Sequence, residues 1–415
     1  MKIYLVGGAV RDQLLGRPVT ERDYVVVGAT PAELLAQGYQ PVGRDFPVFL
    51  HPDTRAEYAL ARTERKTGHG YHGFAMHAAP DVSLEADLLR RDLTINAMAQ
   101  DDDGTLIDPY GGLTDLQNKI LRHVSPAFAE DPLRVLRVAR FAARYASYGF
   151  TVAPDTLTLM RDMVDSGELN HLTPERVWQE TAKALGEDQP GVYIETLRAC
   201  GALKVIFPEL DCLWGVPNPA QWHPEIDTGV HTLMVLDVAC RISTSVRVRF
   251  AALVHDLGKG VTPQQFWPSH RGHEEAGVPI INALADRLKL PNDFRELAVL
   301  TSRFHLHFHR GFQLRPGTVV KVLMQSDALR RPERFQELLL ACEADFRGRE
   351  GWLERAYPQR AYWQHALDAV RAVPVQPLLD QGLQGQRLAD HLTEHRAQAV
   401  ADLRARLAHD SSELA

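Results

Sequence analysis

The stretch LVGGAVRDQLLGRPVTERDYVVV, residues 5–27, decides the fold of the first part of the chain. A β-rich run at residues 2–6 leads into Gly7-Gly8, and a second run fills residues 23–27. Glycines after a strand let backbone N–H groups approach an anion closely. Glu21 and Asp23 stand two residues apart, which places both carboxylates on one face of a strand. Taken singly, the glycine pair is typical of a tight turn, and the carboxylate pair is typical of the solvated start of a strand. Together they favour Mg²⁺-assisted nucleotidyl transfer.

The residues around this stretch extend an α/β head. Short β-rich runs at 47–50 and 57–61 predict further strands. Thr30-Pro31-Ala32-Glu33 is a capping box with proline at the first helical position, so a helix begins there. The Gly- and His-rich segment 66–77 has no periodicity and predicts a loop.

The pattern changes to helical periodicity from about residue 116 onward. Stretches rich in Pro and Gly at 215–224 and 374–385 indicate connections. We therefore expect an α+β protein whose α/β head is followed by an all-helical remainder. The expected parts are a head at 1–114, a neck and body at 115–222, a helical domain at 223–330 and a helical tail at 331–415.

Composition limits the classes of protein that remain. The chain has 415 residues, 45% of them hydrophobic and 24% charged, which is ordinary globular usage. Its formal charge of -7 means that any nucleic acid must meet a local basic surface. The four cysteines are widely spaced and form no metal or disulfide pattern. With no membrane-length apolar run and no signal sequence, we expect a cytosolic protein without a membrane partner.

One predicted helix carries a stripe of arginines. Asp131 precedes Pro132, so it is a plausible N-cap. At 100° per residue, the arginines occupy one side and small apolar residues the other; the arginines are Arg134, Arg137, Arg140 and Arg144. A generic basic helix is often only a solvated face. Since no acid stands four residues away within the helix, the arginines repel each other, which favours contact with an anion such as a triphosphate.

A second group of candidate residues lies in the helical domain. His231, the pair His255-Asp256 and Asp345 combine imidazole and carboxylate ligands, which suit divalent transition metals. His273 and His305 are further candidates. His307 and His309 alternate with Leu306 and Phe308 and are interpreted as surface or packing residues.

The ordered motifs resemble a known family. GGAVRD and E-x-D, then RRDLTINAMA at 90–99, DPYGG at 108–112 and EDPLRVLRVARFAARY at 130–145, resemble class II tRNA nucleotidyltransferases of the DNA polymerase beta-like superfamily. LVHDLGKG at 253–260, GHEEAG at 272–277 and EADFRGR at 343–349 resemble the HD phosphohydrolase superfamily. The likeness runs through nearly the whole chain and is closest to class II enzymes that carry a C-terminal HD domain.

The resemblance implies roles for individual residues. Glu21 and Asp23 would hold Mg²⁺, and Asp131 and Arg134 would hydrogen-bond the base edges of CTP or ATP, so that the protein replaces a nucleic-acid template. Asp92 is implied in ribose recognition. Other nucleotide contacts would come from Gly8, Arg11, Arg91, Arg137 and Arg140. The HD residues would bind Ni²⁺ or another divalent metal and hydrolyse 2′,3′-cyclic and terminal phosphates.

The implied activity is addition and repair of the 3′-terminal CCA of tRNA. Its partners would be the tRNA 3′ end, CTP and ATP, with the chain a monomer or a homodimer. One alternative is a poly(A) polymerase, which is disfavoured because those enzymes carry a long basic tail and lack the HD signature. Another is an HD hydrolase whose head only binds RNA, since Glu21 stands where the superfamily commonly has Asp. The extra methylene of Glu moves the carboxylate by about 1 Å in a site that demands near-octahedral geometry.

Overall fold

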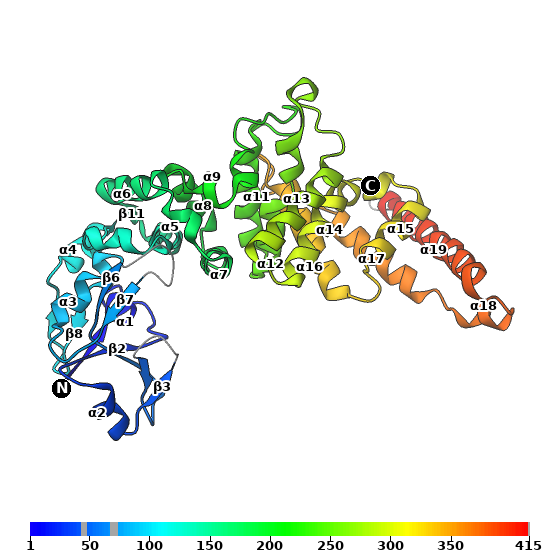
Figure 1. The fold of residues 1–415 in the computed structure, drawn as a ribbon. Coiled ribbons are helices and arrows are strands. Elements are labelled where there is room, and N and C mark those ends of the chain that lie inside the picture. The colour runs from blue at the N-terminus through cyan, green and yellow to red at the C-terminus, as the bar shows by residue number, and fades with distance from the viewer. Residues whose placement is uncertain (43–47, 67–73, 414–415) are drawn as a thin grey trace. The chain divides into compact units, whose positions relative to one another are not determined.

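A computed structural model describes residues 1–42, 48–66 and 74–413. The chain divides into two compact units, Met1–Ile206 and Phe207–Ala415, here called the N-terminal and C-terminal units (Figure 1). Each is described by itself. The expected division into four parts is finer than this one and stays a prediction.

The N-terminal unit is built on a mixed sheet with strand order β3-β4-β5-β2-β1-β8-β9. Its strands are β1 (Lys2–Val6), β2 (Asp23–Val27), β3 (Gln40–Val42), β4 (Val48–Leu50), β5 (Glu57–Leu60), β8 (Ala99–Gln100) and β9 (Leu106–Ile107). β2 pairs antiparallel with β1 and parallel with β5. The parallel register sets Asp23 opposite Glu57, which places two carboxylate-bearing residues side by side at the start of both strands.

Strand β2 lies at the centre because both of its faces are apolar. Successive side chains of a strand point to opposite faces. Val25 packs in a cluster with Leu88 of α3 (Leu84–Leu89), while Val26 packs in another with Leu34 of α2 (Pro31–Ala36). Helices therefore bring apolar side chains to both faces of the sheet and hold the end of β2 that bears Asp23.

Most of the expected local structure of the head is confirmed. The runs 2–6 and 23–27 are strands, and Thr30 caps α2 in a complete capping box with Glu33. The loop expected at 66–77 is wrong for 74–77, because β7 (Phe74–His77) pairs antiparallel with β6 (Thr63–Lys66). Backbone pairing overrides the composition there; residues 67–73 of the expected loop lie outside the described residues.

Helices form the rest of the N-terminal unit, as expected. They are α1 (Gly8–Leu14), α4 (Gly112–Asn118), α5 (Leu133–Tyr145), α6 (Pro154–Asp165), α7 (Pro174–Leu185), α8 (Pro190–Ala199) and α9 (Ala202–Ile206). One short parallel pair, β10 (Ile120–Leu121) with β11 (Thr151–Val152), interrupts them. The apolar face of α5 is fully buried at Val135, Val138 and Ala139, which fixes the direction of its arginine stripe.

The C-terminal unit is helical (Figure 1). Its helices are α10 (Pro208–Asp211), α11 (Thr228–Ile242), α12 (Val246–Val254), α13 (His273–Leu288), α14 (Asn292–His309), α15 (Pro316–Gln325), α16 (Pro332–Arg347), α17 (Gln359–Ala372), α18 (Gln376–Asp380) and α19 (Gly385–Glu413). Short 3₁₀ segments include η5 (Leu257–Val261), η6 (Gln264–Phe266) and η7 (Gly311–Gln313). All four cysteines are free, and within the described residues no helix has the length and apolarity to cross a membrane.

Candidate functional sites

One cavity of about 1000 Å³ in the N-terminal unit is lined by every residue predicted for metal or nucleotide binding in the head and the neck and body. These residues are Gly8, Arg11, Glu21, Asp23, Arg91, Asp92, Asp131, Arg134, Arg137 and Arg140. They come from four separate stretches of sequence. Carboxylates and guanidinium groups therefore face the same space, which suits a metal ion together with a polyanion.

The glycine turn after β1 permits a close approach of an arginine. Gly7 has φ +67°, and a Cβ added there would lie 2.9 Å from Nη1 of Arg91. Gly8 begins α1, and Arg11 on that helix is buried, where it donates to Asp12 and Asn96. The turn thus packs against Arg91 and Arg11, two arginines that line the cavity.

Three carboxylates line the cavity beside β2. Glu21 precedes the strand, Asp23 begins it, and Glu57 begins the neighbouring β5. Burial raises the pKa of Asp23; Arg91 lowers it and the Glu21 charge raises it further. Oxygen ligands from clustered carboxylates fit Mg²⁺, and a cation would relieve this crowding of charge. The sequence reasoning missed Glu57, since only the strand register places it there.

Asp92 is held by protein donors in this structure. One of its oxygens lies 2.7 Å from Nη2 of Arg137, and the other accepts hydrogen bonds from Asn96 Nδ2 and the backbone of Leu93. Although burial opposes ionisation, Arg137 and these hydrogen bonds hold the pKa of Asp92 well below its usual range. Its position in the cavity agrees with the sequence prediction, and its firmest contact orients Arg137.

The arginine stripe of α5 meets carboxylates from other segments, which the sequence reasoning did not foresee. Arg140 Nε lies 2.7 Å from an oxygen of Glu180 on α7. Arg144 Nη2 is 3.8 Å from Asp12. Charge repulsion along the stripe is thus reduced by the fold itself, before any ligand is present.

The two residues expected to contact bases are also held in place. Asp131 lies just outside α5, where one oxygen accepts from the Leu133 N–H and the other pairs with Arg176 at 2.9 Å. Arg134 donates to the carbonyls of Ala127 and Arg90, both at 2.6 Å. The helix begins one residue later than the expected Pro132.

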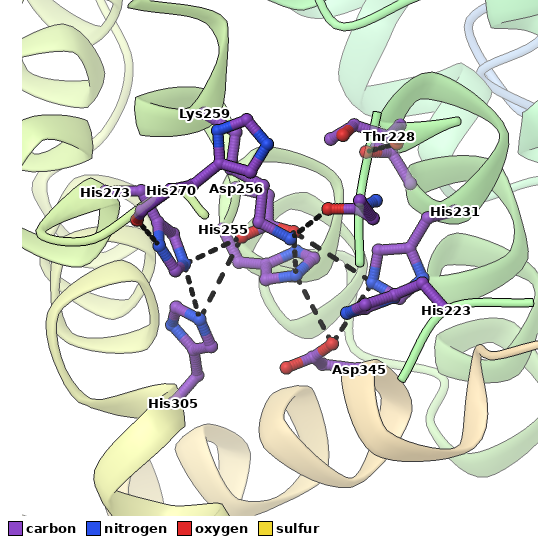
Figure 2. Close-up of polar contacts among 12 residues, drawn as sticks. His223, Thr228, His231, His255, Asp256, Lys259, His270, His273, His305 and Asp345 are labelled. Atoms are coloured by element: carbon purple, nitrogen blue, oxygen red, sulfur yellow. Dashed lines mark hydrogen bonds and ion pairs between the residues drawn. The ribbon is translucent and has the colours of Figure 1, made fainter. Parts of the chain in front are cut away.

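A second cluster lies inside the C-terminal unit (Figure 2). His231 comes from α11, His255 and Asp256 from the end of α12, His273 and His305 from α13 and α14, and Asp345 from α16. Every one of these predicted residues is buried. His255 Nε2 lies 3.2 Å from Asp256, His231 Nε2 lies 3.2 Å from Asp345, and His273 Nε2 lies 3.2 Å from Asp256.

The far side of each imidazole is fixed by an acceptor. Nδ1 of His255 lies 2.7 Å from the carbonyl oxygen of Ala252, and Nδ1 of His273 lies 2.7 Å from that of His270. Nδ1 of His305 lies 2.8 Å from the carbonyl oxygen of Ser302. Nδ1 of His231 lies 2.8 Å from Glu225. A carbonyl only accepts, so an Nδ1 that faces one carries the proton, and each ring offers an Nε2 lone pair to the cluster when it is neutral.

This donor set fits divalent metal. His273 and His305 face each other through Nε2 atoms 3.2 Å apart, an approach of two lone pairs that a cation between them would relieve. Two of the groups whose ligand atoms lie within metal-binding reach consist of predicted residues: His231 with His255 and Asp256, and Asp256 with His273 and His305. Asp256 belongs to both of these groups, so its carboxylate would contribute to metal binding in either one. A third group joins His231 to His223 and Glu225.

Burial and charge act oppositely on these groups. Burial is the main cause that lowers the pKa of His305, to about 3; the neighbouring His273 lowers it further, while the Asp345 charge opposes the shift. For His255 burial is outweighed by Asp256 and Asp345, which raise its pKa to about 10. The His255 charge in turn holds the pKa values of Asp256 and Asp345 well below their usual range despite burial. A bound cation would replace the proton on His255 as partner of the two carboxylates.

Three further residues belong to this cluster. The interpretation of His309 as a surface or packing residue is wrong, because its Nε2 lies 2.6 Å from Asp345. In a helix His305 and His309, four residues apart, share a face, and the interpretation of His309 from its alternation with Leu and Phe did not take this into account. Lys259 Nζ lies 2.7 Å from Asp256, and Glu225 contacts the Nδ1 atom of His231, on the other side of the ring from the Nε2 that faces Asp345.

The chain matches known families along most of its length. Residues 3–122 match the Poly A polymerase head domain, residues 149–213 the family described as "Probable RNA and SrmB- binding site of polymerase A", and residues 228–345 the HD domain. The chain is 60% identical over 401 residues to the multifunctional CCA protein of Pseudoalteromonas atlantica, covering 97% of this chain and 99% of that protein. The chain belongs to the multifunctional CCA protein family. The Thioalkalivibrio sulfidiphilus member is also 60% identical, over 98% of this chain and 99% of its own length.

Solved structures share the fold of this multifunctional CCA protein family member. A CCA-adding enzyme in apo form II has a TM-score of 0.65 at 19% identity, covering 98% of this chain and 92% of its own. A CCA-adding enzyme in complex with ATP has a TM-score of 0.64 at 19% identity, with 96% and 86% covered. The Thermotoga maritima CCA-adding enzyme complexed with tRNA scores 0.60 at 18% identity, over 97% and 91%. The fold expected from the sequence is thereby confirmed.

Proposed function

We propose that this protein adds and repairs the 3′-terminal CCA of tRNA, using CTP and ATP and releasing pyrophosphate. The observation that carries the proposal is the cavity of the N-terminal unit, in which the predicted metal-binding and nucleotide-binding residues meet. The names of the relatives support it, as do solved CCA-adding enzymes with ATP, CTP and tRNA.

In the proposed reaction the 3′-hydroxyl oxygen of tRNA bonds to the α-phosphorus of the nucleotide. The bond from that phosphorus to the bridging oxygen breaks, the hydroxyl loses its proton, and pyrophosphate leaves. Glu21, Asp23 and Glu57 would hold Mg²⁺, which when bound lowers the pKa of the hydroxyl and offsets phosphate charge. Arg11, Arg91, Arg137 and Arg140 would orient the triphosphate.

Base selection would fall to Asp131 and Arg134. A carboxylate accepts from the amino group that cytosine and adenine share, and a guanidinium donates to ring acceptors. Arg176 and the two carbonyls limit the rotamers of both side chains, which favours a fixed protein template. Asp92, through Arg137 or directly, would position the ribose and triphosphate.

We further propose that the buried His and Asp cluster hydrolyses 2′,3′-cyclic phosphates and terminal phosphates. It would hold Ni²⁺ or another divalent metal, which when bound polarises a phosphate and acidifies water. The convergence of Nε2 atoms on Asp256 and Asp345 carries this second activity. Such hydrolysis would prepare damaged tRNA ends for the head. We propose a cytosolic monomer or homodimer without a membrane partner.

The decisive experiment incubates the full chain with tRNA lacking its 3′ end, Mg²⁺ and labelled CTP or ATP, singly and together. Sequential incorporation of C, C and A supports the proposal, whereas long A tails would indicate a poly(A) polymerase. No incorporation with intact cyclic phosphodiesterase activity would indicate an HD hydrolase with an RNA-binding head. Glu21→Asp should preserve or raise incorporation; equal rates for wild type, Glu21→Asp and Glu21→Ala would show that Glu21 binds no metal.

A further inference from the structure

A separate cavity of about 570 Å³ opens beside the buried metal cluster. Its lining includes His273, one of the candidate ligands, and Gly258, which lies two residues after Asp256. The remaining wall is mainly apolar and contains Val261, Phe266 and Ala276. The volume falls within the range of small-molecule sites, which combine apolar walls with a few polar groups. A ligand in this cavity would therefore lie against His273, whose Nε2 lies 3.2 Å from Asp256 of the cluster.

The most unusual residue of the wall is Phe266. Its side chain is 56% exposed, and among the described residues no aromatic ring packs against it. Leaving a phenylalanine in water forgoes the favourable free energy that burial of its ring would bring. Phe312 is also exposed, at 46%, but its ring stacks 4.6 Å from that of Tyr362, so packing explains it. No comparable packing contact explains Phe266.

The segment that presents Phe266 is ordered by its own hydrogen bonds. Phe266 ends η6, where its N–H donates to the Pro263 carbonyl at 2.9 Å and its carbonyl accepts from Ser269 at 2.8 Å. Trp267 Nε1 donates to the Thr262 carbonyl at 3.0 Å. The backbone thus holds the ring at the cavity, which lowers the entropic cost of using it as a contact surface.

We propose that this cavity binds the nucleobase of the nucleotide whose 2′- or 3′-phosphate reacts at the metal cluster, with Phe266 as the stacking surface. The proposal rests on the phosphohydrolase function proposed above and names its substrate class. A phosphate held at His273 would leave the attached ribose and base to extend into the apolar wall. Arg271, exposed on the rim, adds a cation near the ribose and phosphate. Because every base has a flat π-face, stacking favours nucleotides over base-free phosphate esters without strong base preference.

The test compares two secondary phosphate monoesters, 2′-AMP and glycerol 2-phosphate, on the Ni²⁺-loaded full chain. Phe266→Ala should raise KM for 2′-AMP about 5- to 150-fold with little change in kcat, since stacking binds ground and transition states alike. KM for glycerol 2-phosphate should not change, because it has no base. Phe266→Trp should retain wild-type KM for 2′-AMP, and Phe312→Ala is the control for loss of an exposed aromatic ring.

The outcomes separate this inference from the function on which it rests. If the wild type hydrolyses neither ester, nor 2′,3′-cyclic AMP, the phosphohydrolase function fails and the inference with it. If the wild type is active but Phe266→Ala leaves KM for 2′-AMP unchanged, or alters both esters equally, the nucleobase site is refuted while the hydrolase stands. Comparing 2′,3′-cyclic AMP with an RNA ending in a cyclic phosphate identifies the kind of substrate that uses the site. A rise of KM in Phe266→Ala for either substrate supports the site and assigns it to that substrate.

Discussion

Replacing Glu225 by glutamine should weaken metal binding at one candidate group of the buried cluster, His231 with His255 and Asp256, and leave metal binding at the group of Asp256, His273 and His305 unchanged. Oε1 of Glu225 lies 2.8 Å from Nδ1 of His231 and 2.9 Å from Nδ1 of His223. Burial opposes its ionisation, but the two histidines outweigh burial and hold the pKa of Glu225 well below its usual range, so it is anionic at neutral pH. Glutamine keeps the shape and an acceptor oxygen but removes the charge that increases the basicity of His231.

Losing such an outer partner costs about 10- to 100-fold in metal affinity, which corresponds to about 1.4–2.7 kcal/mol. The loss should fall on the group formed by His231, His255 and Asp256. The group formed by Asp256, His273 and His305 does not include a contact of Glu225 and should keep its affinity. In Glu225→Gln we therefore expect a lower metal affinity at the group that contains His231 and an unchanged metal affinity at the group that contains His273.

The assay is competition for Ni²⁺ between the protein and a chromophoric chelator, fitted with two sites. Asp256→Asn serves as the contrasting variant, because it removes charge from both groups and should weaken both ions. Nucleotide incorporation by Glu225→Gln should equal that of the wild type, since Glu225 lies in the other unit from the head cavity. Unchanged affinity at both sites, or an equal loss at both, would refute the reasoning.

Three further predictions concern the N-terminal unit. Gly7→Ala should lower the free energy of unfolding by about 1–3 kcal/mol, and by more than Gly16→Ala does. Both glycines have a positive φ, but only at Gly7 would the added Cβ lie 2.9 Å from Arg91. Calorimetry of the two variants measures the difference. Because the pKa of Asp92 is lowered in the folded state, its carboxylate stabilises the fold above its unfolded pKa of about 3.9, and this stabilisation is lost as the pH falls toward the folded pKa. Acid titrations followed by circular dichroism should therefore show a smaller loss of stability in Asp92→Asn than in the wild type. Glu57→Gln should raise the Mg²⁺ concentration for half-maximal incorporation by about 10-fold or more, and an unchanged Mg²⁺ titration would exclude Glu57 as a ligand.

The sequence predicted features whose geometry is local. The capping box at Thr30 and the arginine stripe depend on local helix geometry, and the structure has both of them near their expected places. Placing Glu21 and Asp23 together on one strand was wrong, because β2 begins at Asp23 and Glu21 precedes it. The ordered histidines and aspartates of the HD pattern also converge as expected (Figure 2).

Features that depend on pairing between distant segments were not accessible. Glu57 joins Asp23 only through the parallel register of β2 and β5. His309 on α14 contacts Asp345 on α16 because the two helices pack together, and the sequence of either helix alone does not determine that packing. Glu225 contacts His231 from a turn that precedes α11 and has no periodic pattern of its own.

The surroundings of the arginine stripe depend on the fold as well as on the helix that carries it. Repulsion along the helix favoured an anion, and the fold supplies one in the carboxylates of Asp92 and Glu180. These pairs do not remove the capacity for a ligand. Arg137 uses Nε and Nη2 on Asp92, while its Nη1 lies 3.9 Å from Glu180, beyond hydrogen-bond distance. A guanidinium has five N–H donors in a rigid fork, so a phosphate can bind the remaining ones without breaking the pair with Asp92. The carboxylates therefore orient the arginines in advance, which lowers the cost of binding a triphosphate on a protein whose net charge is -7.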